Sequence, residues 1–180
     1  CTAVALVDND IEASGGNGIL VNAPQELLGR DFALRRNRVA GSGANGIAVY
    51  ARGAVVASAN LVTSSGNRST ALSVVTGGRA RVAMSNNVVR DSAAHGVFVR
   101  GADRGLVQNS IIHTSADTGM TLRDSADMQV VNNLLYANAT DGLAVGTGGG
   151  ASPRPVVSNN TIYANGARGF VLGSGGVASP

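Results

Sequence analysis

Residues 87–99 read NVVRDSAAHGVFV, and the pattern in this stretch recurs along the whole chain. An asparagine is followed by an aliphatic residue two positions later, and by a glycine that opens a run of alternating apolar residues nine positions later. We call this asparagine the anchor. The anchors, one of which is a serine, are Asn9, Asn37, Asn60, Asn87, Ser110, Asn133 and Asn160. Because 23 to 28 residues separate them, the chain consists of seven repeats.

Each repeat contains three short segments in which every second residue is apolar. In the repeat around Asn87, Val82 and Met84 precede the anchor, Val97 and Val99 follow the glycine, and a third segment follows the anchor directly. Side chains two positions apart share one face of a strand, so these segments predict β-strands. Three strands in every repeat predict an all-β solenoid whose coils pair in parallel. Seven coils at about 4.8 Å each would form a rod of about 34 Å.

The anchor column has two physical explanations. Asparagine adopts the left-handed backbone conformation more readily than most residues, so we expect it to form the bend between two strands. Asparagine amides that stack along the rod can also hydrogen-bond to one another.

The repeat resembles that of the right-handed parallel β-helix proteins of the pectate-lyase-like kind. The resemblance rests on the motif Asn-x-aliphatic, a polar turn, and then a residue such as Asn45, His95 or Asp141 before Gly-aliphatic-x-aliphatic. It covers residues 1–180, so we expect one right-handed single-stranded parallel β-helix domain of about seven coils with three short strands each. Neither end carries the cap that a solenoid needs, so we expect a segment of a longer protein.

The activity does not follow from this resemblance, because the family includes polysaccharide lyases, hydrolases and epimerases as well as tailspikes and adhesins. The resemblance implies a bacterial, carbohydrate-associated protein that is extracellular, periplasmic or on the cell surface. Mannuronan epimerases would carry Tyr-Gly-Phe-Asp-Pro-His on one glycine strand, whereas the stretch that begins at His95 contains no Asp-Pro-His. Whether this chain is an enzyme therefore stays open; a polysaccharide lyase or epimerase is the class we would expect.

Composition argues against several other classes. The chain has 14 basic and 11 acidic residues, and aromatic residues make up 3% of it. The arginines are scattered except for Arg35, Arg36 and Arg38, and no aromatic residues lie among them, so we expect no nucleic-acid partner. No stretch approaches the ~20 apolar residues of a membrane-spanning helix. A single cysteine provides no disulfide framework.

Stacked coils would bring equivalent residues of successive repeats together on the outside of the glycine strands. Arginine binds carboxylates through two hydrogen bonds, and an aromatic face stacks on the C–H groups of a sugar. We therefore predict that this face binds a polysaccharide, in particular an acidic one. The alternative is that these polar side chains only solvate the sheet. The candidate substrate-binding residues are His95, Phe98, Arg100, Thr121, Arg123, Asp141 and Arg168.

A second column, three positions after the anchor, contains Arg90, His113 and Tyr136 on successive coils. These three residues could act as charge stabiliser, base and acid in a β-elimination. They could equally form an exterior ladder that serves packing alone.

Two further features concern ligands and partners. Asp103, Asp124 and Asp127 are the candidate for a calcium site, and we expect no other cofactor and no other metal. The position directly after the anchor is aliphatic in four successive repeats, which predicts self-association or packing against another segment of the chain. These residues are Leu61, Val88, Ile111 and Leu134.

Three functions fit the sequence. The first is a segment that binds acidic polysaccharide without catalysis. The second is a lyase or epimerase that acts on uronate-containing glycans. The third is a structural stalk or adhesin segment, with the aliphatic column as its assembly face.

Overall fold

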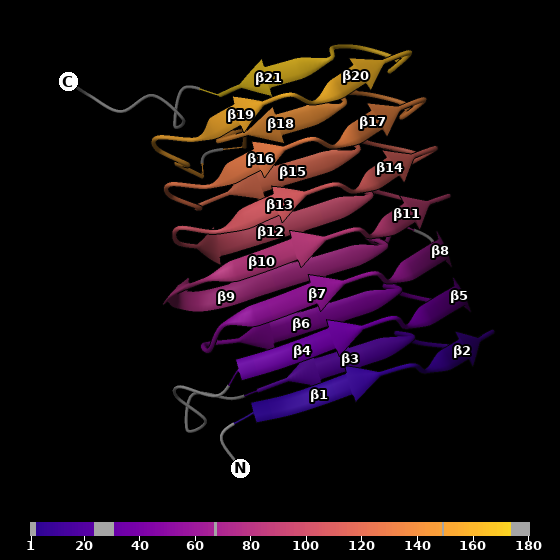
Figure 1. Cartoon of the computed structure of the whole chain (residues 1–180). Coiled ribbons are helices and arrows are strands. Elements are labelled where there is room, and N and C mark those ends of the chain that lie inside the picture. Colours follow the sequence, from indigo (N-terminus) through magenta and orange to yellow (C-terminus); the bar gives the residue numbers. More distant parts are fainter. Residues whose placement is uncertain (1–2, 24–30, 67, 149, 174–180) are drawn as a thin grey trace.

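The computed structural model describes residues 3–23, 31–66, 68–148 and 150–173, so both ends of the expected 1–180 domain lie partly outside the described residues. The chain winds into a rod whose coils lie one above another, with the first strand at one end and the last at the other (Figure 1). All the described strands belong to three parallel sheets of seven strands each. The predicted parallel β-helix is therefore confirmed.

Each coil contributes one strand to each sheet. The first sheet contains β1 (Ala3–Val7), β4 (Asp31–Arg35), β7 (Val55–Ser58), β10 (Val82–Ser85), β13 (Leu106–Gln108), β16 (Gln129–Val131) and β19 (Val156–Ser158). The second contains β2 (Asp10–Glu12), β5 (Arg38–Ser42), β8 (Leu61–Ser65), β11 (Val88–Arg90), β14 (Ile111–His113), β17 (Leu134–Tyr136) and β20 (Thr161–Tyr163). The third contains β3 (Ile19–Asn22), β6 (Ile47–Ala51), β9 (Leu72–Ala80), β12 (Val97–Ala102), β15 (Met120–Arg123), β18 (Leu143–Val145) and β21 (Phe170–Leu172).

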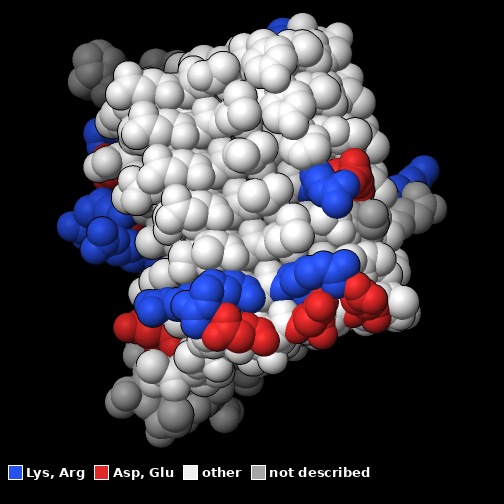
Figure 2. All heavy atoms as spheres, turned by 45° about the vertical axis from the view of Figure 1, so that its right-hand side comes forward, with Lys and Arg blue, Asp and Glu red and all other residues white. Residues whose placement is uncertain are grey.

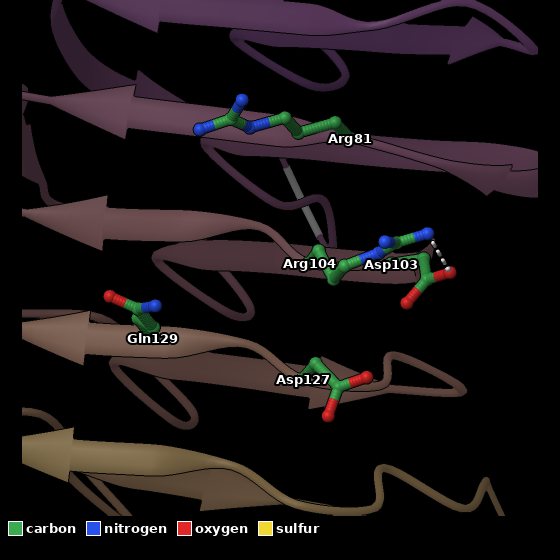
Figure 3. A pocket seen from close by; sticks show the side chains of 5 residues that line it. All are labelled: Arg81, Asp103, Arg104, Asp127 and Gln129. Carbon is green, nitrogen blue, oxygen red and sulfur yellow. Dashed lines mark ion pairs between the residues drawn. The ribbon is translucent and has the colours of Figure 1, made fainter.

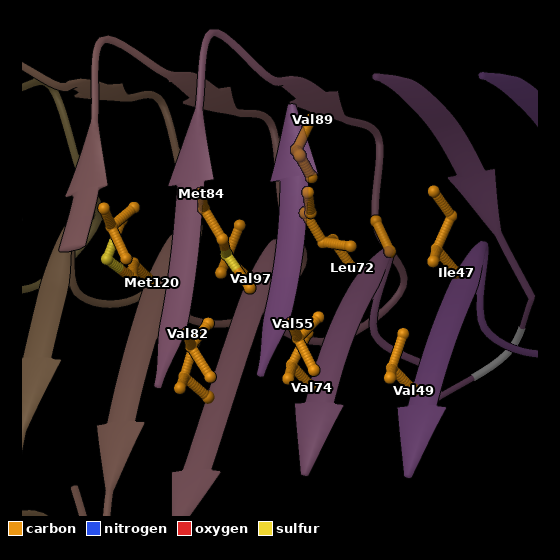
Figure 4. Packing of buried hydrophobic residues seen from close by; sticks show 14 of the residues in the cluster. Ile47, Val49, Val55, Leu72, Val74, Val82, Met84, Val89, Val97 and Met120 are labelled. Atoms are coloured by element: carbon orange, nitrogen blue, oxygen red, sulfur yellow. The ribbon is translucent and has the colours of Figure 1, made fainter. Parts of the chain in front are cut away.

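The register of these strands follows the repeat. Val89 pairs with Val62 on one side and with Ile112 on the other, so residues two positions after successive anchors lie side by side. Alternate residues of the strands in all three sheets point inward, and the apolar side chains among them form one continuous core (Figure 4). Burying one such aliphatic side chain stabilises the fold by about 1.5 to 3 kcal/mol.

The anchor asparagines form a ladder inside the rod. Asn60 is 1% exposed, and its amide nitrogen donates to Oδ1 of Asn87 at 3.0 Å and to the carbonyl of Leu34 at 2.9 Å. Its own Oδ1 accepts from the backbone and the side-chain nitrogens of Asn37, both at 3.0 Å. Hydrogen bonding between stacked amides is thus confirmed, because each amide is both donor and acceptor.

The expectation that the anchor itself adopts the left-handed conformation is wrong. Asn86, directly before the anchor Asn87, has a φ of 57°, and Asp91, four residues after the anchor, also has a φ of 57°. Asn87 is not among the described residues with positive φ. The bends therefore lie on either side of the three-residue strand β11, and the anchor between them places its side chain in the ladder.

A second polar column lies five positions after the anchors. It begins with serines, among which the hydroxyl groups of Ser65 and Ser92 lie 3.0 Å apart, and it ends with Asn138 and Asn165, whose amides hydrogen-bond at 2.9 Å. Sequence analysis missed this column, although the constant offset from the anchor is visible in the repeat.

The glycine that opens the third strand has a steric reason. A Cβ atom on Gly96 would lie 2.7 Å from the carbonyl oxygen of Gly119 and 2.6 Å from a methyl carbon of Ile112. A side chain on Gly96 would push these coils apart, so glycine here serves close stacking, although Ala71 is accommodated at the equivalent position of the third repeat.

We predict that Asn60→Ala lowers the free energy of unfolding by about 2 to 4 kcal/mol, because it removes a buried side chain that makes four hydrogen bonds and leaves their partners unpaired. Urea unfolding measures the change. The control is Gln108→Ala, on the half-buried outer face of β13, with an expected change within about 0.5 kcal/mol. Equal losses in the two variants would contradict a special role for the ladder.

Ser110 interrupts the amide ladder, since the side-chain nitrogen of Asn87 donates to the carbonyl of Ala57 but reaches no amide on the next coil. We expect Ser110→Asn to raise the free energy of unfolding by about 1 kcal/mol, the worth of one buried hydrogen bond. Ser110→Ala is the matched variant and should lower it. If Ser110→Asn is less stable than the wild type in urea, the coil spacing here has no room for a second amide.

Candidate functional site

The outer face of the third sheet brings five of the predicted binding residues together. Phe98 of β12 pairs with Thr121 of β15, and Arg100 pairs with Arg123 in the same register. His95 lies just before β12, where its ring stacks on that of Phe98 with the centroids 5.7 Å apart. We call these five residues the His95 strip.

Phe98 lies between His95 and Arg123 and contacts both of them. The guanidinium carbon of Arg123 lies 5.8 Å from the centroid of the Phe98 ring, within the range of a cation–π contact. A histidine, an aromatic ring and an arginine therefore form one patch of flat groups across two coils.

His95 has a carboxylate partner that sequence analysis missed. Its Nδ1 lies 3.6 Å from Oδ2 of Asp117 and 3.4 Å from the hydroxyl of Thr121. The other oxygen of Asp117 accepts a hydrogen bond of 2.9 Å from Thr140, which holds the carboxylate in place. The negative charge of Asp117 on this side of the ring favours the neutral tautomer that carries its proton on Nδ1, in which Nε2 is the unprotonated nitrogen.

The surroundings of His95 favour this neutral ring. Burial lowers the pKa of His95 below its ordinary value of 6.5. The carboxylate of Asp117 raises the pKa, and the positive charge of Arg123 lowers it further, so that the net direction is downward.

Arg123 differs from the other arginines of this face. Arg100 is paired with Asp124 at 2.8 Å, whereas Arg123 donates to the carbonyl oxygen of Thr147 at 3.1 Å and forms no ion pair with any described residue. The chain at Gly148 packs closely against the Arg123 guanidinium and helps to fix its position. Arg123 thus has a positive charge that no carboxylate of the described residues neutralises.

Two predicted binding residues are engaged with each other instead. Asp141 accepts two hydrogen bonds from Arg168, at 2.9 and 3.1 Å, and is 8% exposed. The pair lies further along the rod than the His95 strip, and its charges neutralise one another. The structure therefore does not join Asp141 or Arg168 to the strip.

The second column forms a packed ladder on the second sheet. His113 stacks on Tyr136 at 4.7 Å and 9°, and Tyr136 stacks on Tyr163 at 5.3 Å and 4°. Arg90 pairs with Asp91 at 2.8 Å. The ring faces cover each other, and burial lowers the pKa of His113. This is the geometry of the packing alternative, and catalysis by Arg90, His113 and Tyr136 stays a prediction.

The aliphatic column lies on the same outer face. Leu61, Val88, Ile111 and Leu134 follow one another in register, and Ile111 is 37% exposed while the other three are half-buried. Figure 2 shows this face almost free of charge, apart from one ion pair halfway up and two rows of charged residues near the N-terminal end. Self-association through it stays a prediction.

The three aspartates of the candidate calcium site do not converge. Asp124 pairs with Arg100, and Asp127 accepts two hydrogen bonds from Arg154, at 2.6 and 2.7 Å. Across the described ranges, no three histidine, cysteine, aspartate or glutamate side chains lie close enough to hold a metal ion. The described part of the chain also contains no helix with the length and apolar character needed to cross a bilayer.

Solved structures share this fold at low sequence identity. The A-module of the Azotobacter vinelandii mannuronan C-5 epimerase AlgE4 aligns with a TM-score of 0.71 and 16% identity, over 98% of this chain and 56% of that one. The A-module of AlgE6 from the same organism aligns at 0.70 and 16%, over 93% and 52%. A mutant of the periplasmic alginate epimerase AlgG aligns at 0.72 and 16%, over 94% and 42%.

The chain thus spans about half the length of these epimerases, and the likeness concerns the fold. No curated protein matches the sequence. Residues 17–179 match the family described as a right-handed β-helix region, which agrees with the seven stacked coils and with the handedness expected for the solenoid. The chain belongs to this family of right-handed parallel β-helix proteins.

Proposed function

We propose that this segment binds an acidic polysaccharide on the outer face of the third sheet, at the His95 strip. The observation that carries the proposal is the unneutralised guanidinium of Arg123 beside Phe98. A guanidinium matches a sugar carboxylate in both charge and geometry. The carboxylate of a uronate residue would take the place that an aspartate occupies at Arg100.

The stacking of Arg100 on Arg123 supports the same ligand class. Their backbones are paired in adjacent strands, so two positive side chains project from neighbouring coils with one aspartate between them. This single aspartate, which pairs with Arg100, cannot neutralise two guanidinium groups, so an added anion would be attracted to the remaining positive charge of Arg123. A polymer with a carboxylate on every sugar offers such anions at regular intervals.

The structural neighbours favour this class as well. They are epimerases of mannuronan or alginate, which are polymers of uronate sugars, and one of them is described as periplasmic. A periplasmic or extracellular bacterial location is part of our proposal.

We expect Arg123→Gln to reduce affinity for polymannuronate about tenfold or more, the loss typical of a charge-assisted hydrogen bond. Isothermal titration calorimetry measures it, with a neutral glycan as the ligand control. Arg35→Gln is the matched variant, because Arg35 is an exposed arginine on the first sheet, away from the strip. Polymannuronate binding that survives Arg123→Gln undiminished would refute the strip as the site.

A second candidate function is proton abstraction from a bound uronate, and the pairing of His95 with Asp117 is what favours it. Lyases and epimerases of uronates both begin by removing the proton on the carbon next to the carboxylate. Arg123 would neutralise that carboxylate, and the neutral ring of His95, held by Asp117 and Thr121, would accept the proton at Nε2. The column of His113 fits this role less well, because Arg90 is already paired with Asp91.

This second function predicts a defined pH dependence. Only the neutral ring accepts a proton, and its pKa lies below 6.5, so the rate should reach a plateau by about pH 7 and fall in more acidic solution. His95→Asn should abolish the reaction, whereas His113→Asn should leave it intact. Product is followed by the absorbance of unsaturated uronates for a lyase, and by proton exchange from solvent for an epimerase. If neither signal appears with polymannuronate or polygalacturonate, this segment is not a catalyst of either reaction.

A further inference from the structure

We propose that a hollow at the turns that lead from the third sheet to the first is a second binding site, separate from the His95 strip, for a carboxylate-bearing sugar. The hollow has a volume of about 710 Å³. Figure 3 shows the side chains that line it, which come from three successive coils. They are Arg81, Asp103, Arg104, Asp127 and Gln129.

The stacking of coils places two arginines next to each other at this hollow. Ala80 pairs with Ala102 and Ala83 with Leu106, so the turn before β13 is one residue longer than the turn before β10. Arg81 therefore lies opposite both Asp103 and Arg104 of the next coil. The coil spacing separates their backbones by about 4.8 Å. Figure 3 shows the side chains of Arg81 and Arg104 extending in opposite directions, so their guanidinium groups line two different parts of the hollow.

The carboxylates nearby pair with Arg104 and Arg154 and leave Arg81 without a carboxylate partner among the described residues. Asp127 is bound through both oxygens by Arg154, and this hydrogen-bonded pairing holds the pKa of Asp127 below its ordinary value. Asp103 lies 4.0 Å from Arg104, whose side chain is 81% exposed. Arg81 forms no ion pair with any described residue.

Elsewhere on this rod, stacked charges are opposite in sign. Asp8 lies against Arg36, Asp127 against Arg154, and Asp141 against Arg168, each through a two-point contact between neighbouring coils. Arg81 departs from this pattern at the hollow, as Arg123 does at the His95 strip, because neither forms an ion pair with a described residue. At both places the fold leaves positive charge for a ligand to neutralise.

The other groups of the hollow select the class of ligand. The exposed amide of Gln129 can both donate and accept hydrogen bonds, and Asp103 can accept them from hydroxyl groups. Guanidinium groups, an amide and a carboxylate together suit a molecule that carries a carboxylate and several hydroxyls. This is the chemistry of a uronate sugar, because a bare anion has no hydroxyl groups to donate to Asp103 or to Gln129.

The site is tested in the Arg123→Gln background, where the His95 strip is weakened. We expect a short oligomannuronate to bind this variant at one site, and Arg81→Gln or Arg104→Gln to weaken that binding about tenfold. Arg35→Gln is the control for removing one exposed arginine. Arg35, Arg81 and Arg104 are exposed, so replacing them should leave thermal unfolding of the Arg123→Gln background unchanged, and an unchanged unfolding temperature separates a loss of binding from misfolding.

Each outcome of the titration has one meaning. If the Arg123→Gln background shows no binding, or if Arg81→Gln and Arg104→Gln both bind as it does, the hollow is not a site. If inorganic phosphate or acetate competes as strongly as glucuronate, the site does not select a sugar, and the proposed ligand class is wrong. If Arg123→Gln alone binds as tightly as the wild type while Arg81→Gln loses binding, the strip fails and the hollow stands.

Discussion

The placement of each residue directly beside its equivalent on the next coil is the constraint on which the rest of this structure depends. Each polar side chain has its counterpart as a neighbour at the spacing of one coil. Asparagine satisfies this condition well, because its amide donates to one neighbour and accepts from the other. The resulting ladder through Asn37, Asn60 and Asn87 ties buried backbone carbonyls to the side chains and fixes the register of the strands on both sides.

The same constraint decides the pattern of charge. Several charged side chains meet a charge of opposite sign on a neighbouring coil, as Arg36 meets Asp8. Arg123 instead lies beside Arg100, whose own charge is neutralised by Asp124. Exposed ion pairs contribute little to stability, so their main effect is to neutralise the surface. Positive charge remains where an arginine has no carboxylate partner among the described residues, as at Arg81 and Arg123, and the two proposed binding sites lie at these arginines.

Contacts between strand residues could be predicted from the sequence, whereas contacts between turn residues could not. The pairing of Phe98 with Thr121 could be foreseen because strands have a period of two and equal offsets from the anchor. The contact between His95 and Asp117 could not, because the two residues lie at unequal offsets in the turns before successive strands. Turn conformation depends on the local backbone, as the left-handed Asn86 beside its regular neighbour Asn87 illustrates.

The sequence by itself determined the class of fold, the number of strands per coil, the inward-facing residues and the columns on each outer face. These features all follow from the periodic pattern of residues, which can be read from a single sequence. Only the tertiary structure decided which charges are neutralised. Arg100, Arg123 and Arg168 are equivalent in the sequence as surface arginines, but their partners come from turns on another coil. Such contacts depend on how each turn folds back over the sheet, and the repeat does not specify that path.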